Sequence, residues 1–171
     1  MELKIRDAQI DDLPAMLEIY NDAVRNLTAT FDLEEQTLET RREWFFSHGG
    51  RYPLIVAESE GNVVGYCSLS KYREKEAYIN SAELSVYISK DFRRNGLGTI
   101  FLKEIIKRAK ELKYHTIISG ITDGNSGSIA LHEKFGFHYI GCFREVGYKF
   151  NQWQDVHFYQ LLLEDTKRSI E

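Results

Sequence analysis

The fold class is decided by two neighbouring stretches of sequence, Ala82-Glu83-Leu84-Ser85-Val86-Tyr87-Ile88 and Arg93-Arg94-Asn95-Gly96-Leu97-Gly98-Thr99. In the first, apolar residues alternate with polar ones, which is the period-2 pattern of a strand with one buried face. After the second, apolar residues recur at helical spacing over about 98–112, at Phe101, Leu102, Ile105, Ile106, Ala109 and Leu112. Together the two stretches predict a strand, a glycine-containing turn and a helix.

Outward from this unit, strands and helices alternate in a mixed α/β order. Strands are predicted at 3–6, 54–57, 63–67, 116–121, 139–143 and 156–163, with a hairpin turn at Glu60-Gly61-Asn62. Helices are predicted after Asp11 and Thr37, each acting as an N-cap, and over 126–135. Since the sequence contains no repeat, low-complexity segment or linker, we expect residues 1–171 to form a single domain.

Composition excludes several classes of protein. The chain has 22 Lys and Arg against 26 Asp and Glu, a formal charge of −4, so a nucleic-acid-binding surface is not expected. Residues 91–115, however, hold seven basic and three acidic residues, a local excess that suits a small anionic ligand or a solvated helix face. The five histidines and two cysteines lack metal-ligand spacing, so no metal site is expected.

The cellular compartment is indicated by the cysteines and by the first residues of the chain. Cys67 and Cys142 lie in apolar runs, a pattern that is typical of buried thiols in proteins of a reducing compartment. No signal-peptide pattern follows Met1, and no apolar run approaches the ~18 residues of a membrane span. We therefore expect a cytoplasmic protein.

The glycine turn between the 82–88 strand and the next helix predicts an anion site. Two glycines let backbone N–H groups approach an anion, and the helix N-terminus adds its dipole. A dinucleotide fingerprint is disfavoured because Phe101 replaces its third glycine, and no Walker A lysine follows. What remains is a short pyrophosphate cradle, or a plain glycine turn before a helix.

Two spaced motifs resemble the GNAT superfamily of N-acetyltransferases. The first is Arg-x-x-Gly-x-Gly at 93–98, and the second comprises Asn125, Ser128, Leu131, His132 and Gly136-Phe137. The resemblance implies an α/β (α+β) fold in which helices flank a mixed, mostly antiparallel twisted sheet, with acetyl-CoA as co-substrate.

A narrower resemblance, covering roughly residues 3–163, is to the phosphinothricin N-acetyltransferases. It is carried by Ile19-Tyr20-Asn21, Thr30-Phe31, Gln36-Thr37, Tyr52-Pro53, Ala77-Tyr78, Glu83, Gly147-Tyr148-Lys149, Trp153 and Asp155-Val156. It implies a homodimer that acetylates the α-amino group of a small amino acid or analogue, such as phosphinothricin, methionine sulfoximine or methionine sulfone. The aromatic-rich C-terminal run fits a dimer interface, and it also fits ordinary core.

The resemblance implies cofactor-binding roles for residues of both motifs and of the strand before them. They are Val86, Tyr87, Ile88, Arg93, Arg94, Asn95, Gly96, Leu97, Gly98, Thr99, Asn125 and Ser128. The backbone of Val86 and Ile88 is expected to bind the pantetheine arm. For Asn125, an ordinary helix cap is the alternative.

The catalytic residues implied by the resemblance are Glu83 and His132. Glu83 is a carboxylate in an otherwise apolar strand, where burial raises a carboxyl pKa and prepares it to accept a proton from an ammonium. The alternative is a salt-bridged structural glutamate. His132 stands where most of the superfamily has a tyrosine that protonates the leaving thiolate, and its alternative is a histidine packed between helix and sheet.

The amino-acid pocket implied by the resemblance comprises Phe31, Arg73, Lys75, Tyr78, Ser85 and Tyr87. A guanidinium can clamp a carboxylate or phosphinate through two parallel hydrogen bonds. From the residues alone, 73–76 also reads as a solvated turn. Two other functions stay open: acetylation of a protein N-terminus, polyamine or aminoglycoside, and a non-catalytic acyl-CoA sensor.

Overall fold

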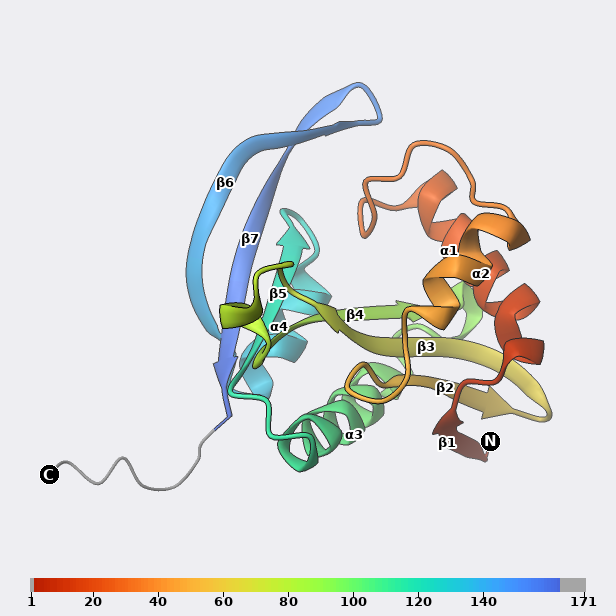
Figure 1. Cartoon of the computed structure of the whole chain (residues 1–171). Coiled ribbons are helices and arrows are strands. Elements are labelled where there is room, and N and C mark those ends of the chain that lie inside the picture. Colours follow the sequence, from red (N-terminus) through yellow and green to blue (C-terminus); the bar gives the residue numbers. More distant parts are fainter. Residues whose placement is uncertain (1, 164–171) are drawn as a thin grey trace, which may run out of the picture.

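The computed structural model describes residues 2–163 and contains a seven-stranded mixed sheet. Its order is β1-β2-β3-β4-β5-β7-β6, antiparallel except for the parallel pair β4–β5. The strands are β1 (Leu3–Asp7), β2 (Leu54–Ser59), β3 (Asn62–Lys71), β4 (Ser81–Ile88), β5 (Thr116–Thr122), β6 (His138–Lys149) and β7 (Gln152–Leu162). This confirms the mostly antiparallel sheet expected from the sequence (Figure 1).

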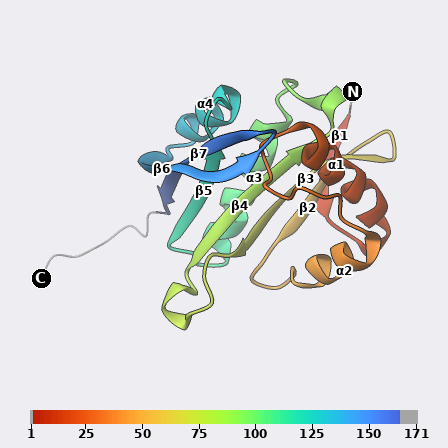
Figure 2. The ribbon, with the colours of Figure 1, turned by 90° about the horizontal axis from the view of Figure 1, so that it is seen from above.

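Helices cover both faces of the sheet (Figure 1, Figure 2). They are α1 (Leu13–Asn26), α2 (Leu38–Phe46), α3 (Leu97–Glu111) and α4 (Ser126–Lys134), with short 3-10 helices at Ile10–Asp12, Glu76–Tyr78 and Lys90–Phe92. One core lies between α1, α2 and the β2–β3 strands, and a larger one lies beneath α3 and α4. No helix among residues 2–163 has the length and apolar character of a membrane span.

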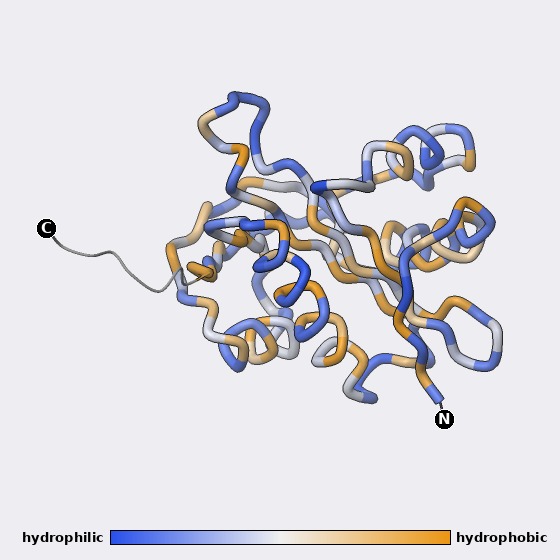
Figure 3. Tube along the Cα trace, turned by 60° about the horizontal axis from the view of Figure 1, so that its bottom comes forward, coloured by the Kyte–Doolittle hydropathy of each residue, from blue (hydrophilic) through white to orange (hydrophobic). Residues whose placement is uncertain are grey.

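The apolar patterns explain these elements. The α3 stripe Phe101, Leu102, Ile105 and Ala109 is fully buried against the sheet, so the period-3.6 spacing defines the packing face. Figure 3 shows the hydrophobic stretches concentrated along the central strands and the hydrophilic ones in peripheral loops. The β2–β3 turn has left-handed backbone at both Glu60 and Gly61, as a two-residue hairpin requires.

Several predicted boundaries differ from those observed, and β2 and β3 are both longer than the predicted 54–57 and 63–67. Asp11 does not cap α1: Asp12 occupies the N-cap, and its carboxylate instead accepts hydrogen bonds from the Gln9 backbone and the Arg6 guanidinium. The last two strands extend further than predicted and meet in a hairpin at Phe150 and Asn151. The register shift between Phe143 and Gly147 interrupts the alternation that would have revealed the longer strand.

The parallel strands β4 and β5 separate part-way along their length. They pair only at Ser81–Glu83 with Thr116–Ile118, although β4 continues to Ile88 and β5 to Thr122. Beyond Glu83, the edge of β4 that faces β5 therefore has no strand partner. Unpaired backbone groups at such a split are available to an extended ligand.

Candidate active site

A cavity of about 200 Å³ opens where β4 and β5 separate. Seven of the predicted site residues line it: Glu83, Ser85, Val86, Tyr87, Asn125, Ser128 and His132. The fold thus brings the strand and the second motif together, as the sequence implied. Two hydroxyl residues of β5, Ser119 and Thr122, also line the cavity and were missed by the sequence analysis, because in sequence they are ordinary strand residues.

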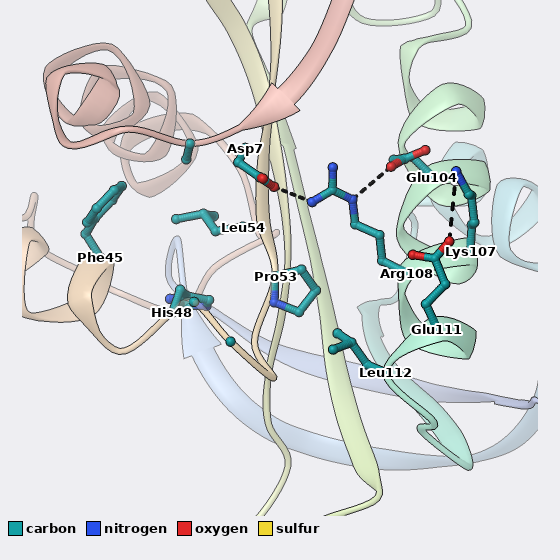
Figure 4. Close-up of a pocket in the computed structure, with 13 residues that line it drawn as sticks. Asp7, Phe45, His48, Pro53, Leu54, Glu104, Lys107, Arg108, Glu111 and Leu112 are labelled. Atoms are coloured by element: carbon teal, nitrogen blue, oxygen red, sulfur yellow. Dashed lines mark hydrogen bonds and ion pairs between the residues drawn. The ribbon is translucent and has the colours of Figure 1, made fainter.

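A larger cavity, of about 660 Å³, lies between α3, the end of β1 and the loop after α2 (Figure 4). Arg108 binds Asp7 and Glu104, and Lys107 lies 4.0 Å from Glu111. Its charged side chains are thus paired with one another, and none of the predicted site residues lines it. For these reasons we place the candidate active site in the smaller cavity.

The N-terminus of α3 lies at the glycine turn for which an anion cradle is predicted. Gly96 occupies the N-cap with φ 81°, a left-handed conformation that favours glycine, and no side chain caps the helix. Gly98 has a different role, because a Cβ there would lie 2.8 Å from Leu131 of α4. The first glycine therefore shapes the turn, whereas the second allows α3 and α4 to pack closely.

The two arginines of the cradle are not equivalent. The Arg93 guanidinium donates to the Ile88 carbonyl oxygen at 3.0 Å and forms an ion pair of 2.9 Å with Asp22 of α1. Arg94 is exposed and has left-handed backbone with φ 62°. The positive charge of Arg93 is thus already paired within the protein, whereas Arg94 forms no ion pair with the residues from 2 to 163.

Glu83 projects from β4 into the smaller cavity. Its side chain remains open to solvent through the mouth of the cavity, yet the surrounding protein atoms desolvate the carboxylate and raise its pKa. The positive charge of Arg73 opposes this shift without a hydrogen bond. No ion pair of Glu83 is found within residues 2–163, so the salt-bridged alternative has no support in the described structure.

His132 is buried between α4 and β5. Its Nδ1 lies 2.7 Å from the Ser128 carbonyl oxygen, and its Nε2 lies 2.8 Å from the Ser119 hydroxyl. Because a carbonyl only accepts, Nδ1 carries the proton and Ser119 donates to Nε2. Burial lowers the pKa of the imidazole, which favours this neutral form. Any proton exchange between His132 and a ligand would therefore pass through Ser119.

Asn125 combines both roles considered from the sequence. Its side-chain oxygen accepts a hydrogen bond of 3.2 Å from the Ser128 backbone, so it caps α4. Both residues also line the cavity. The cap therefore orients the start of α4 toward the split between the strands.

The predicted substrate residues are spread over three segments. Ser85 and Tyr87 line the cavity, and the Tyr87 ring stacks on Tyr66 with 5.3 Å between ring centroids. Phe31, from the α1–α2 loop, packs against Gly147 of β6. The other three, Arg73, Lys75 and Tyr78, are exposed in the β3–β4 loop outside the cavity lining.

Comparison with known proteins agrees with this geometry. Residues 5–158 match the family model described as an acetyltransferase (GNAT) domain. The chain is 40% identical, over 98% of both chains, to an L-methionine sulfoximine/L-methionine sulfone acetyltransferase of Pseudomonas aeruginosa. It is 37% identical to a phosphinothricin N-acetyltransferase of Streptomyces coelicolor, over 93% of this chain and 95% of the relative.

A solved structure shows the same architecture. A phosphinothricin acetyltransferase from Sinorhizobium meliloti in complex with AcCoA superposes with a TM-score of 0.92 at 34% identity, covering 95% of this chain and 89% of that one. The chain therefore belongs to the GNAT family of acetyl-CoA-dependent N-acetyltransferases.

Proposed function

We propose that this protein transfers the acetyl group of acetyl-CoA to the α-amino group of a small amino acid or analogue. Candidate substrates are phosphinothricin, methionine sulfoximine and methionine sulfone, after the names of the relatives. The observation that carries the proposal is the cavity at the β4–β5 split, which is lined by the cap and first turn of α4 and contains a carboxylate of raised pKa.

The chain offers acetyl-CoA a continuous binding surface. The pyrophosphate would accept hydrogen bonds from the first N–H groups of α3, at Leu97, Gly98 and Thr99, and would meet the charge of Arg94. The pantetheine arm would lie along the unpaired edge of β4, against the backbone of Val86 and Ile88. The remaining residues proposed around the cofactor are Tyr87, Arg93, Asn95, Gly96, Asn125 and Ser128.

Acetyl-CoA supplies the activated thioester, and the protein transfers the protons and aligns the two substrates. Glu83 removes a proton from the substrate ammonium, and the neutral amine attacks the thioester carbonyl in a ternary complex. The C–N bond forms, the C–S bond breaks and the thiolate leaves with the electron pair. Backbone N–H groups of β4 stabilise the oxyanion. The thiolate receives its proton from water, or from the Ser119 hydroxyl while a protonated His132 Nε2 returns a proton to the Ser119 oxygen.

The substrate's anionic groups are assigned to the β3–β4 loop. Arg73 lies near enough to Glu83 to affect its pKa, so its guanidinium can hold a carboxylate close to the base. Lys75 and Tyr78 extend the same loop. The walls are completed by Phe31, Ser85 and Tyr87.

We further propose a cytoplasmic homodimer in which residues 1–171 form one domain. Cytoplasmic location is supported by the free thiols of Cys67 and Cys142. Dimerisation is supported by large apolar side chains left exposed on the β6–β7 hairpin, among them Phe143 (60% exposed) and Trp153 (63% exposed). Size-exclusion chromatography with light scattering should give the mass of a dimer, and Trp153→Asp should shift it toward the monomer.

A thiol-release screen tests the function. Purified protein is mixed with acetyl-CoA and single amines: amino acids, their sulfone, sulfoximine and phosphinate analogues, an N-terminal peptide panel and polyamines. Release confined to the amino-acid group supports the proposal. Release with peptides or polyamines points to a different amine class, and acetyl-CoA binding without any release would identify a sensor.

A further inference from the structure

The imidazole of His48 links the larger cavity to the strand next to Glu83. His48 follows α2 and lines the larger cavity (Figure 4). Its Nε2 is 3.0 Å from the hydroxyl of Ser70 on β3. Ser70 is the direct cross-strand partner of Glu83 in the β3–β4 register. Directly opposed residues of an antiparallel pair share one face, with Cβ atoms about 4.5–5.5 Å apart. The Ser70 side chain thus lies on the same face of the sheet as the proposed base, and its hydroxyl contacts His48.

The hydrogen bonds of this group have a defined direction. His48 Nδ1 lies 2.9 Å from the Trp44 carbonyl oxygen, which only accepts, so Nδ1 carries the ring proton. Nε2 is then an acceptor, and the Ser70 O–H donates to it. The lone pairs of the Ser70 oxygen stay available to a protonated Glu83. A hydrogen bond from protonated Glu83 to this oxygen would complete a chain of donors from Glu83 through Ser70 to His48.

The proposed reaction requires an exit for one proton. An ammonium and a thioester give an amide, a thiol and one free proton, so each turnover leaves a proton to be released. The cavity at Glu83 has a volume of about 200 Å³, and the two substrates would fill it during reaction. The larger cavity on the other side of His48 stays open to solvent.

We propose that Ser70 and His48 carry the proton that Glu83 removes from the substrate to solvent in the larger cavity, an inference that rests on the proposed function. Protonated Glu83 gives its O–H proton to the Ser70 oxygen while Ser70 gives its own proton to His48 Nε2. Glu83 is again a carboxylate, Ser70 is unchanged and His48 is an imidazolium. The imidazolium then loses its Nδ1 proton to water, and tautomer exchange with that water restores the starting state.

The environment of His48 suits a group that is protonated only briefly. Its burial, together with the nearby positive charge of Arg41, lowers the imidazole pKa, so the ring is neutral at rest and releases a proton readily. The Trp44 ring packs against the imidazole at 4.7 Å between centroids and holds its orientation. The charged groups of the adjoining cavity are Asp7, Glu104, Lys107, Arg108 and Glu111.

The chain provides a matched control on the same strand. Ser68 faces the same side of β3, two residues before Ser70, but its hydroxyl is buried without a hydrogen-bond partner. Ser68→Ala and Ser70→Ala remove the same atom from neighbouring positions. Only the second interrupts the path from Glu83 to His48.

The test measures the single-turnover rate of thiol release at saturating substrates. We expect Ser70→Ala and His48→Ala to slow it roughly tenfold or more with unchanged KM values, and Ser68→Ala to leave it unchanged. Ser70→Thr, which keeps the hydroxyl, should restore the rate. Added imidazole should accelerate His48→Ala through the open larger cavity and have no effect on Ser70→Ala.

The relay is overturned if Ser70→Ala and His48→Ala react within twofold of Ser68→Ala, or if neither threonine nor imidazole restores the rate. Circular dichroism checks that each variant is folded. Imidazole rescue compares the same His48→Ala protein with and without imidazole, so differences in folding between variants do not affect it. Glu83→Gln separates the two levels of the proposal. If Glu83→Gln is fully active, Glu83 is not the base and the proposed function fails at that step. If Glu83→Gln is slow while the Ser70 and His48 variants react normally, Glu83 remains the base and only the relay is excluded.

Discussion

The ammonium nitrogen of Lys149, on β6, lies 2.6 Å from the carbonyl oxygen of Leu27, just past the end of α1. It also donates to the Thr30 carbonyl oxygen at 2.8 Å, although its side chain is only 2% exposed. A single cation thus binds the α1 terminus and the following loop, where the helix dipole favours positive charge. Since Phe31 follows Thr30 and packs on Gly147 of β6, this contact positions one wall of the proposed substrate pocket.

Replacing Lys149 should affect stability and substrate binding together. Lys149→Met leaves buried carbonyl groups without donors, so the free energy of unfolding should fall by about 2–4 kcal/mol in urea titrations. The KM for the amino acid should rise as Phe31 shifts, and acetyl-CoA affinity should stay nearly constant. Lys103→Met, on the exposed face of α3, is the control and should change stability by less than about 0.5 kcal/mol. Equal stability of the two variants would contradict the positioning role.

Glu83→Gln should slow turnover by roughly 10²–10⁴ while leaving acetyl-CoA binding intact, because the amide cannot accept the ammonium proton. The same change should alter the pH dependence of stability. The folded pKa is raised above the unfolded value, so in the window between them the folded state binds more protons and stability falls as pH rises. Urea titrations across pH 4–8 measure this slope, which the variant should lack. Unchanged turnover at neutral pH would exclude Glu83 as the base.

His132 should influence acid stability in the opposite sense. Its folded pKa is lowered, so its contribution is present above the unfolded value of 6.5 and is lost as pH falls through the folded pKa. His132→Asn should therefore show a flatter loss of stability below pH 6.5. If the Ser119–His132 pair supplies the thiolate proton, Ser119→Ala and His132→Asn should slow thiol release to a similar extent. Normal rates in both variants would leave water as the donor.

Alanine substitutions of Arg93 and Arg94 should have different effects. Arg94→Ala should weaken acetyl-CoA binding about tenfold, measured by calorimetry, with little change in stability. Arg93→Ala breaks the ion pair with Asp22 and should cost about 1 kcal/mol of stability instead. Asp22→Ala is the matched control, since it breaks the same pair from the other side. Loss of stability in Arg94→Ala would mean that the two roles are reversed.

Much of the site was predictable because its information is local. The alternation of Ala82–Ile88, the glycines at 96 and 98 and the cap at Asn125 each occupy a few consecutive residues, and backbone geometry follows from them directly. These patterns defined the strand, the uncapped helix and the second motif, and residues of the strand and of the second motif line one cavity. Element boundaries were less predictable, as in the N-cap at Asp12, the longer β3 and the long β6–β7 hairpin.

By itself, then, the sequence determined the order of strands and helices and the residue types at the cradle and the base. Tertiary structure decided which of two adjacent arginines pairs with Asp22, that the Ser119 hydroxyl of β5 meets His132, and that β4 and β5 separate beyond Glu83. The physical reason is that these properties depend on partners far along the chain. Asp22 is 71 residues from Arg93, and Leu27 is 122 residues from Lys149. No local pattern records which of these distant groups will meet when the sheet assembles.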